Sequence, residues 1–275
     1  MALRSQEIPA RPMKPFIPLL LAAALALSCA APEEPPEPVL VWAEEFSADG
    51  PPDPAVWSYE VGLIRNQEAQ YYTEGRLENA RVEGGNLVIE SRKEEYAGAH
   101  YTSASVNTLG KREFFRGRIE VRAKIPTGRG SWPAIWMMGT NIPQAGWPEC
   151  GEIDIMENVG YEPDMIYATV HTPGSVNDPG KVDRGGHIDI ADPFSGFHVY
   201  AVEWHSDRLD FFVDGEKYFT YRKDARYPHY WRFDRPFYLL LNTAIGGNWG
   251  GQQGIDDAIF PLRYVIDYVR YYLWE

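Results

Sequence analysis

Short runs of alternating apolar and polar residues recur along most of this chain, and they limit its fold more than any other feature. Residues 118–125, Arg-Ile-Glu-Val-Arg-Ala-Lys-Ile, alternate without a break, and residues 197–204 and 208–213 alternate in part. A period of two is typical of strands that bury one face. Long helical periodicity and a strand–helix–strand rhythm are both missing, so the pattern predicts an all-β protein.

The turn residues between the runs indicate how the strands connect. Asp214-Gly215 joins the run 208–213 to the run 216–221, which is a strong signal for a two-residue β-hairpin. Further strands are predicted at 237–243 and 265–273, and the 25 glycines and 22 prolines suit many short strands joined by turns. We therefore expect a β-sandwich of jelly-roll type, with two antiparallel sheets and a concave cleft.

Three carboxylates crowd into the run Glu-Ile-Asp-Ile-Met-Glu at 152–157. In a regular strand, Glu152 and Asp154 would share one face, and Glu157 would join the isoleucines on the other. An unpaired carboxylate in an apolar layer is very costly. One extra residue, a β-bulge near residues 155–156, would turn Glu157 onto the face of the other two acids. The alternative is a solvated edge strand, which the isoleucines and nearby tryptophans disfavour.

A shared acidic face would suit chemistry that needs one nucleophilic and one proton-donating carboxylate. Trp132 and Trp136 lie four residues apart just upstream, so their indoles are predicted on one face and could stack on sugar rings, although either could belong to the core. Trp147 and Trp249 are weaker candidates for the same role.

Polar residues elsewhere could complete such a site. Asn66, Glu68 and Gln70 alternate along the chain and could bond sugar hydroxyls, but a solvated strand face explains their spacing equally simply. His171 could bond a catalytic carboxylate or a leaving sugar, or be structural. The chain has no His-Glu-x-x-His or Cys-x-x-Cys pattern, so we expect no catalytic metal and no catalytic cofactor.

Charge narrows the range of partners. The formal net charge is −13 and the sequence pI is about 5.0, so nucleic acid is not an expected partner and a neutral substrate fits better than a polyanion. The only cysteines are Cys29 and Cys150. With Cys29 outside the mature fold, no disulfide is available, and Cys150 is expected to be a structural thiol.

The N-terminus resembles an export signal. An apolar run at 16–27 follows Lys14, is too short for a comfortable membrane span, and ends at Ser28-Cys29 in the manner of a bacterial lipoprotein cleavage site. We expect residues 1–29 to be the signal peptide, with Met13 as an alternative start. Cys29 would carry the lipid that provides the only membrane contact, on an outer-membrane or cell-surface protein. Ordinary cleavage near residues 30–31, giving a secreted protein, is the alternative.

The remaining chain divides simply. Residues 30–38 form a stiff linker rich in proline and glutamate, and residues 39–275 form one catalytic β-jelly-roll domain. We expect this domain to be a monomer.

Several motifs together resemble glycoside hydrolase family 16. The segment 151–157, Gly-Glu-Ile-Asp-Ile-Met-Glu, is similar to the family signature, in the form with two residues between the aspartate and the last glutamate that laminarinases, agarases and carrageenases share. Laminarinase-like segments also occur at 66–72, 132–137, 246–249 and 267–270, in the family's order. The resemblance covers residues 41–273 and implies a retaining endo-glycoside hydrolase that cleaves β-1,3-glucan such as laminarin.

The resemblance also implies roles for single residues. Glu152 matches the nucleophile, Glu157 the acid/base and Asp154 the residue between them. The residues that match sugar-contacting positions are Asn66, Glu68, Trp132, Trp136 and His171. A structural Ca²⁺ away from the cleft is implied at Glu45 and Gly85, through their carbonyls, and at the Asp267 side chain. Ser105 departs from the pattern, because many relatives carry a longer basic side chain there.

Other activities remain open. Within the enzyme class, the alternatives are a β-1,3-1,4 mixed-linkage glucanase and an agarase or carrageenase, although sulfated substrates fit poorly with the acidic balance. Outside it, the alternative is a glucan-binding module on the same sandwich, although such relatives typically lack the two glutamates that this chain carries.

Overall fold

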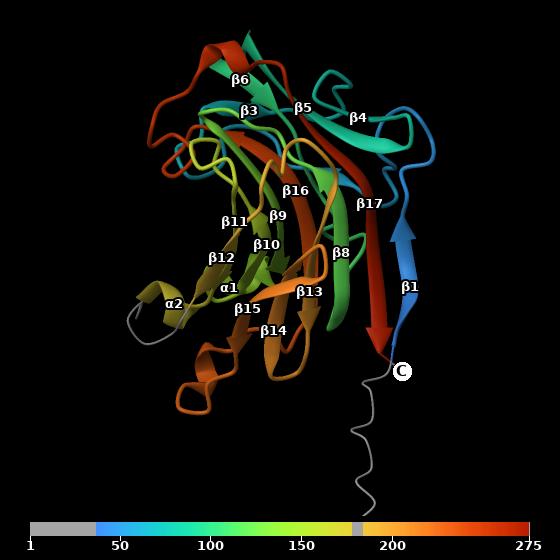
Figure 1. Cartoon of the computed structure of the whole chain (residues 1–275), viewed down its shortest axis with the longest axis vertical. Coiled ribbons are helices and arrows are strands. Elements are labelled where there is room, and N and C mark those ends of the chain that lie inside the picture. Colours follow the sequence, from blue (N-terminus) through green and yellow to red (C-terminus); the bar gives the residue numbers. More distant parts are fainter. Residues whose placement is uncertain (1–36, 178–183, 275) are drawn as a thin grey trace, which may run out of the picture. The chain divides into compact units, whose positions relative to one another are not determined.

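A computed structural model of the chain describes residues 37–177 and 184–274. The expected signal peptide, Cys29 and nearly all of the linker lie outside these residues. Residues 36–275 form one compact unit. No helix among the described residues is long and apolar enough to cross a membrane. The expected all-β architecture is confirmed, with two sheets packed face to face (Figure 1).

The larger sheet has ten strands in the order β15-β14-β13-β8-β17-β5-β6-β3, with β1 beside β17 and β4 beside β5. Its strands are β1 (Pro38–Glu44), β3 (Gln70–Tyr72), β4 (Ala80–Glu83), β5 (Asn86–Tyr96), β6 (Ala99–Ser103), β8 (Gly117–Lys124), β13 (His198–Trp204), β14 (Arg208–Val213), β15 (Glu216–Arg222) and β17 (Leu262–Trp274).

The smaller sheet has seven strands in the order β12-β11-β10-β9-β16-β7-β2. Its strands are β2 (Ser58–Tyr59), β7 (Ser105–Asn107), β9 (Ser131–Gly139), β10 (Glu152–Glu157), β11 (Met165–His171), β12 (Gly185–Asp189) and β16 (Phe237–Ile245). The helical segments are short: α1 (Ile142–Ala145), α2 (Pro173–Asn177), and the 3₁₀ turns η1 (Pro228–Tyr230) and η2 (Asp257–Ile259).

The alternation of apolar and polar residues correctly predicted strands of the larger sheet. The clean alternation at 118–125 corresponds to β8, whose residues are alternately buried and half-buried. Asp214 and Gly215 form the predicted hairpin turn between β14 and β15, and both have positive φ angles, 50° and 83°. One pairing differs from the expectation of antiparallel sheets, because β3 runs parallel to β6.

The main hydrophobic core fills the space between the two sheets. Trp204 and Tyr264 from the larger sheet and Ile135 and Leu241 from the smaller sheet are fully buried in one continuous cluster. β10 contributes Ile153, Ile155 and Met156 to this cluster. Since the inner face of the smaller sheet is occupied in this way, the polar side chains of β9, β10, β11 and β16 that are not in the core point to the opposite face.

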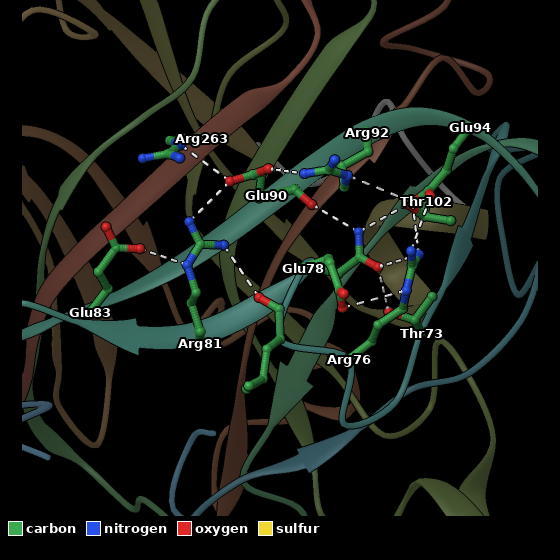
Figure 2. Close-up of polar contacts among 12 residues, drawn as sticks. Thr73, Arg76, Glu78, Arg81, Glu83, Glu90, Arg92, Glu94, Thr102 and Arg263 are labelled. Carbon is green, nitrogen blue, oxygen red and sulfur yellow. Dashed lines mark hydrogen bonds and ion pairs between the residues drawn. The ribbon is translucent and has the colours of Figure 1, made fainter. Parts of the chain in front are cut away.

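An arginine–glutamate network fastens β4, β5 and β17 in the larger sheet (Figure 2). Glu90, on β5, has a side chain only 4% exposed, yet it pairs with Arg81 at 3.0 Å, with Arg263 at 3.2 Å and with Arg92. Three cations around one buried carboxylate compensate for its lost hydration. The network therefore joins three strands through side chains as well as through their backbone ladders.

Candidate active site

A cleft of about 1110 Å³ lies over the smaller sheet. Strands β9, β10, β11 and β16 and the loops before β3 and β10 provide its lining. It collects most of the site residues singled out from the sequence: Asn66, Glu68, Trp132, Trp136, Trp147, Glu152, Asp154, Glu157, His171 and Trp249.

The predicted bulge in β10 is confirmed, and it brings the three acids to this cleft. Against β9, Asp154 pairs with Trp136 and Met156 pairs with Ile135, so Ile155 is the extra residue. The register against β11 shifts over the same stretch. Residues 155 and 156 both enter the core, and alternation then returns Glu157 to the cleft face. An exposed acidic edge strand is excluded, because β10 lies between β9 and β11.

Burial makes the three carboxyl groups hold protons tightly. Loss of hydration, together with the charge of Asp154, raises the pKa of Glu152 to about 8. Loss of hydration also raises the pKa of Glu157 to about 7, and the pKa of Asp154 well above its usual value. Asp154 and Glu152 share a side-chain hydrogen bond. The three groups therefore titrate as one coupled set that keeps at least one proton near neutral pH.

Two tryptophans donate to the two glutamates. The Trp132 indole N–H donates to Glu157 Oε1 at 3.0 Å, and the Trp147 indole N–H donates to Glu152 Oε2 at 2.7 Å. Thr169 also bonds the Glu157 carboxyl. These contacts fix the direction of each carboxyl group. The donors also partly offset the rise in pKa that burial causes, because they stabilise the ionised form.

His171 lies opposite Glu152 on the neighbouring strand, as direct partners in the β10–β11 ladder. Its Nε2 is 3.3 Å from Asp154 Oδ2 and 3.9 Å from Glu152 Oε1. The sequence allows a bond to the acid/base carboxylate or to a leaving sugar, or a structural role. In the structure the residue lies beside Glu152 and Asp154. The pairing of the two strands explains this placement, because residues that are direct partners on neighbouring strands point to the same face of the sheet.

The segment around Asn66 differs from a solvated strand face. Asn66 and Gln67 have φ angles of 53° and 54°, so they form a left-handed turn, and the strand begins only at Gln70. The expected polar group still forms. Asn66 donates to Glu68 at 3.2 Å and Gln70 donates to the same carboxylate at 2.7 Å. Gln70 also accepts from the backbone N–H of Ile245, so it has a structural role.

The ring of Trp136 is too buried to stack on a sugar ring. Its side chain reaches the cleft but is only 7% exposed, and its indole N–H donates to Asn242 at 2.7 Å. The guanidinium of Arg65 lies 4.8 Å above its ring. Trp132 fits the stacking role better, in edge-to-face contact with Trp249 at 5.5 Å.

Arg65 and Glu60 are cleft residues that the sequence did not reveal. Arg65 pairs with Glu60, whose carboxylate also accepts from the Ser105 hydroxyl at 2.6 Å. Arg65 Nη1 is buried without a hydrogen-bond partner among the described residues. Ser105, which donates this bond, is fully buried. No local pattern marks Arg65, because the ring that it covers, Trp136, is distant in the sequence.

Cys150 matches the structural interpretation. It is fully buried and forms no disulfide within the described part of the chain, and burial raises the pKa of its thiol to about 11. A thiol that keeps its proton at neutral pH is a poor nucleophile.

A jelly-roll sandwich that holds two buried glutamates in an aromatic-lined cleft is typical of a glycoside hydrolase. The family model described as "Glycosyl hydrolases family 16" matches residues 67–270. The chain therefore belongs to glycosyl hydrolase family 16.

Two relatives from Rhodothermus marinus illustrate the membership. A β-glucanase is 49% identical over 245 residues, which cover 86% of this chain and 85% of that protein. The crystal structure of a laminarinase from the same organism superposes with a TM-score of 0.83 at 47% identity, covering 87% of this chain and 99% of the other.

A third relative carries a ligand. It is a mutant of SCLam, described as a non-specific endo-β-1,3(4)-glucanase and co-crystallised with 1,3-β-D-cellotriosyl-glucose. It superposes with a TM-score of 0.80 at 44% identity, covering 87% of this chain and 97% of the other.

Proposed function

We propose that this chain is a retaining endo-β-1,3-glucanase that cleaves laminarin-type glucans. The observation that carries the proposal is the bulge of β10, which places Glu152 and Glu157 on one cleft wall. The similarity to β-glucanases and laminarinases supports the glucan as substrate. The cleft, of about 1110 Å³, is lined by several aromatic side chains, which suits several sugar rings of a polymer.

The mechanism assigns one role to each glutamate. Glu152 attacks the anomeric carbon and forms a glycosyl-enzyme, while Glu157 gives its proton to the departing glycosidic oxygen. Glu157 then takes a proton from water, which attacks the same carbon and releases the sugar with its original configuration. Burial, and to a lesser extent the negative charge of Glu152, raises the pKa of Glu157 to about 7, so Glu157 can hold a proton near neutral pH as the first step begins.

The remaining cleft residues bind and orient. Asp154 shares a proton with Glu152 and holds that carboxyl group in place. Trp132 and Trp249 offer apolar surfaces to sugar rings, and Asn66 and Glu68 offer hydrogen bonds to hydroxyls. Trp147, which is 48% exposed beside Glu152, stands at the cleft edge where a ring could cover it.

Azide rescue tests the mechanism. Glu157→Ala should fold and lose nearly all hydrolysis of laminarin. On an aryl β-laminari-oligosaccharide, whose phenolate leaves without a proton, azide should restore turnover and give a β-glycosyl azide. Glu152→Gln should also be inactive, because no nucleophile remains. An α-glycosyl azide would indicate inversion, and normal activity of Glu152→Gln would refute the proposed nucleophile.

Product profiles test the substrate. Laminarin, barley mixed-linkage glucan and agarose should be compared side by side, with release of short oligosaccharides from laminarin expected to be fastest. The SCLam complex favours mixed-linkage glucan as the second candidate. Faster cleavage of mixed-linkage glucan or agarose would overturn the preference. Binding of laminarin without reducing-sugar release would instead indicate a binding module.

We also propose a structural calcium site away from the cleft, at the carbonyls of Glu45 and Gly85 and the side chain of Asp267. Residues beside Glu45 and Gly85 pair with β17 close to Asp267, which supports this grouping. Asp267 already accepts from Arg122 through Oδ2, which leaves Oδ1 for a cation. The melting temperature should be higher with Ca²⁺ than with EGTA, and this difference should be smaller in Asp267→Asn. Equal melting temperatures of the wild type with Ca²⁺ and with EGTA would contradict the proposed site.

We propose further that the chain is exported as a monomer anchored by a lipid on Cys29. The apolar run 16–27, the preceding Lys14 and the following cysteine support this. Mass spectrometry of the mature protein should show a lipidated N-terminus at Cys29, and Cys29→Ala should lose the anchor. A mature chain that begins near residues 30–31 would favour free secretion.

A further inference from the structure

Three side chains in the cleft are placed as metal ligands. Glu152, Asp154 and His171 each offer one ligand atom, and the three atoms all lie within 4.8 Å of one another. His171 Nε2 is 3.3 Å from Asp154 Oδ2 and 3.9 Å from Glu152 Oε1. The strand ladder fixes these distances, because Glu152 and His171 are direct partners on β10 and β11.

The spacing matches a small, tetrahedral ion. Zinc bonds to histidine and carboxylate of about 2.0–2.1 Å place neighbouring ligand atoms about 3.3–3.5 Å apart. The His171–Asp154 edge, at 3.3 Å, already has that length, and the His171–Glu152 edge, at 3.9 Å, is slightly longer. Three protein ligands leave the fourth position open toward the cleft, as in open zinc sites. Calcium fits worse, because it takes six to eight oxygen ligands.

A second observation is an oxygen of Asp154 that is available to bind a cation. Asp154 Oδ2 is buried and has no hydrogen-bond partner among the described residues, although its side chain is only 3% exposed. A buried carboxylate oxygen without a donor is costly. Glu152 is also oriented to bind a metal ion, because Trp147 donates to Oε2 and leaves Oε1 on the side of His171.

We propose that Glu152, Asp154 and His171 form a site for Zn²⁺ or a similar borderline-soft divalent cation, and that its occupation inhibits the enzyme. The bound ion would engage the carboxylate that attacks the sugar and would occupy space above it, so metal and glucan would exclude one another. Only the inhibition rests on the proposed function. The binding of the ion does not.

A matched control lies on the other sheet. Glu203, His205 and Asp210 form the second such group in the described part of the chain. There, however, Arg118 donates to Glu203 at 2.9 Å and Arg208 donates to Asp210 at 2.8 Å. Cations already compensate both carboxylates, so this group should bind a dication weakly. His205→Gln removes its nitrogen ligand and leaves the cleft untouched.

Calorimetric titration with ZnCl₂ tests the site directly. We expect one site in the wild-type protein, the same site in His205→Gln, and binding weaker by about tenfold or more in His171→Asn and Asp154→Asn, because each loses one of three ligands. Two cleft variants are used so that the test can still be made with one of them if the other does not fold. Unchanged affinity in a folded cleft variant, or loss of the site in His205→Gln, would overturn the proposal.

Kinetics test the inhibition. Zn²⁺ should raise KM for laminarin without lowering kcat, and EDTA should reverse this increase. Ca²⁺ at the same concentration should leave KM unchanged. Lowered kcat at unchanged KM would refute exclusion of glucan by the metal. If the chain cleaved no glucan at all, the calorimetric result would still decide whether the site exists, so the two proposals fail separately.

Discussion

Trp147 is bound directly to the carboxyl group to which we assign the nucleophilic role. Its N–H stabilises ionised Glu152 and so lowers the pKa of that group. Trp147→Phe keeps an aromatic ring but removes the donor, so the pKa of Glu152 should rise. Since the nucleophile must be ionised, the acidic limb of the kcat/KM profile should move to higher pH. At pH values on the acidic side of this limb, kcat/KM should be about tenfold lower than in the wild type.

The control for this prediction is a tryptophan remote from the cleft. Trp274, on β17 of the larger sheet, stacks on His205, which directly follows β13 of the same sheet. Trp274→Phe should leave the pH profile in place. A profile of Trp147→Phe that coincides with the wild type would show that the hydrogen bond does not tune Glu152.

Arg65 should contribute to binding more than to chemistry. Its guanidinium lies over Trp136, is held by Glu60, and belongs to a side chain that lines the cleft. Arg65→Ala should raise KM for laminari-oligosaccharides about tenfold and change kcat little, because the lost contact is made equally in ground and transition states. Arg65→Lys should recover only part of the affinity, since an ammonium lacks the planar donor array. An unchanged KM would exclude this role.

At the scale of elements, the Glu90 network joins β4, β5 and β17 in the larger sheet. Glu90→Gln leaves three arginines around an uncharged, buried side chain, so the free energy of unfolding should fall by about 2 kcal/mol in urea denaturation. Glu83→Gln is the matched control, because Glu83 also pairs with Arg81 but is 54% exposed. The control should change little, as expected for a surface pair. Equal effects would contradict a special role for Glu90.

Sequence periodicity predicted elements that depend on local spacing. The strand β8 and the turn at residues 214–215 follow from alternation and turn chemistry alone. The bulge in β10 could also be predicted, because a regular strand would have buried Glu157. The parallel β3–β6 pair, the left-handed turn at Asn66 and the guanidinium over Trp136 were missed, since each depends on contacts between distant segments that leave no periodic signal.

At the scale of the whole molecule, the acid cluster should lower stability as pH rises. The folded protein raises the pKa of Glu152 to about 8 and of Glu157 to about 7, both above the ordinary value of 4.5. Below that ordinary value both the folded and the unfolded chain hold these protons. Above it the unfolded chain releases them first, so the free energy of unfolding falls until the folded-state pKa values are passed.

Removing one of these groups should therefore stabilise the protein only at higher pH. Glu152→Gln should raise the free energy of unfolding on the order of 2 kcal/mol at about pH 8, and very little at about pH 4. Thermal denaturation followed by circular dichroism at both pH values measures this. A gain of equal size at both would mean that packing, and not ionisation, limits stability here.

The extra residue in β10 has a further consequence for how this site tolerates a change in length. Without Ile155, the segment would read Glu-Ile-Asp-Met-Glu, and plain alternation would still keep every acid on the outer side. Excision or addition of one residue at this point leaves an even spacing between Glu152 and Glu157, so a strand without a bulge would keep both acids on the outer side in either case. Chains that differ by a single codon at this place can thus share one chemistry, which makes the bulge a natural point for length variation in evolution.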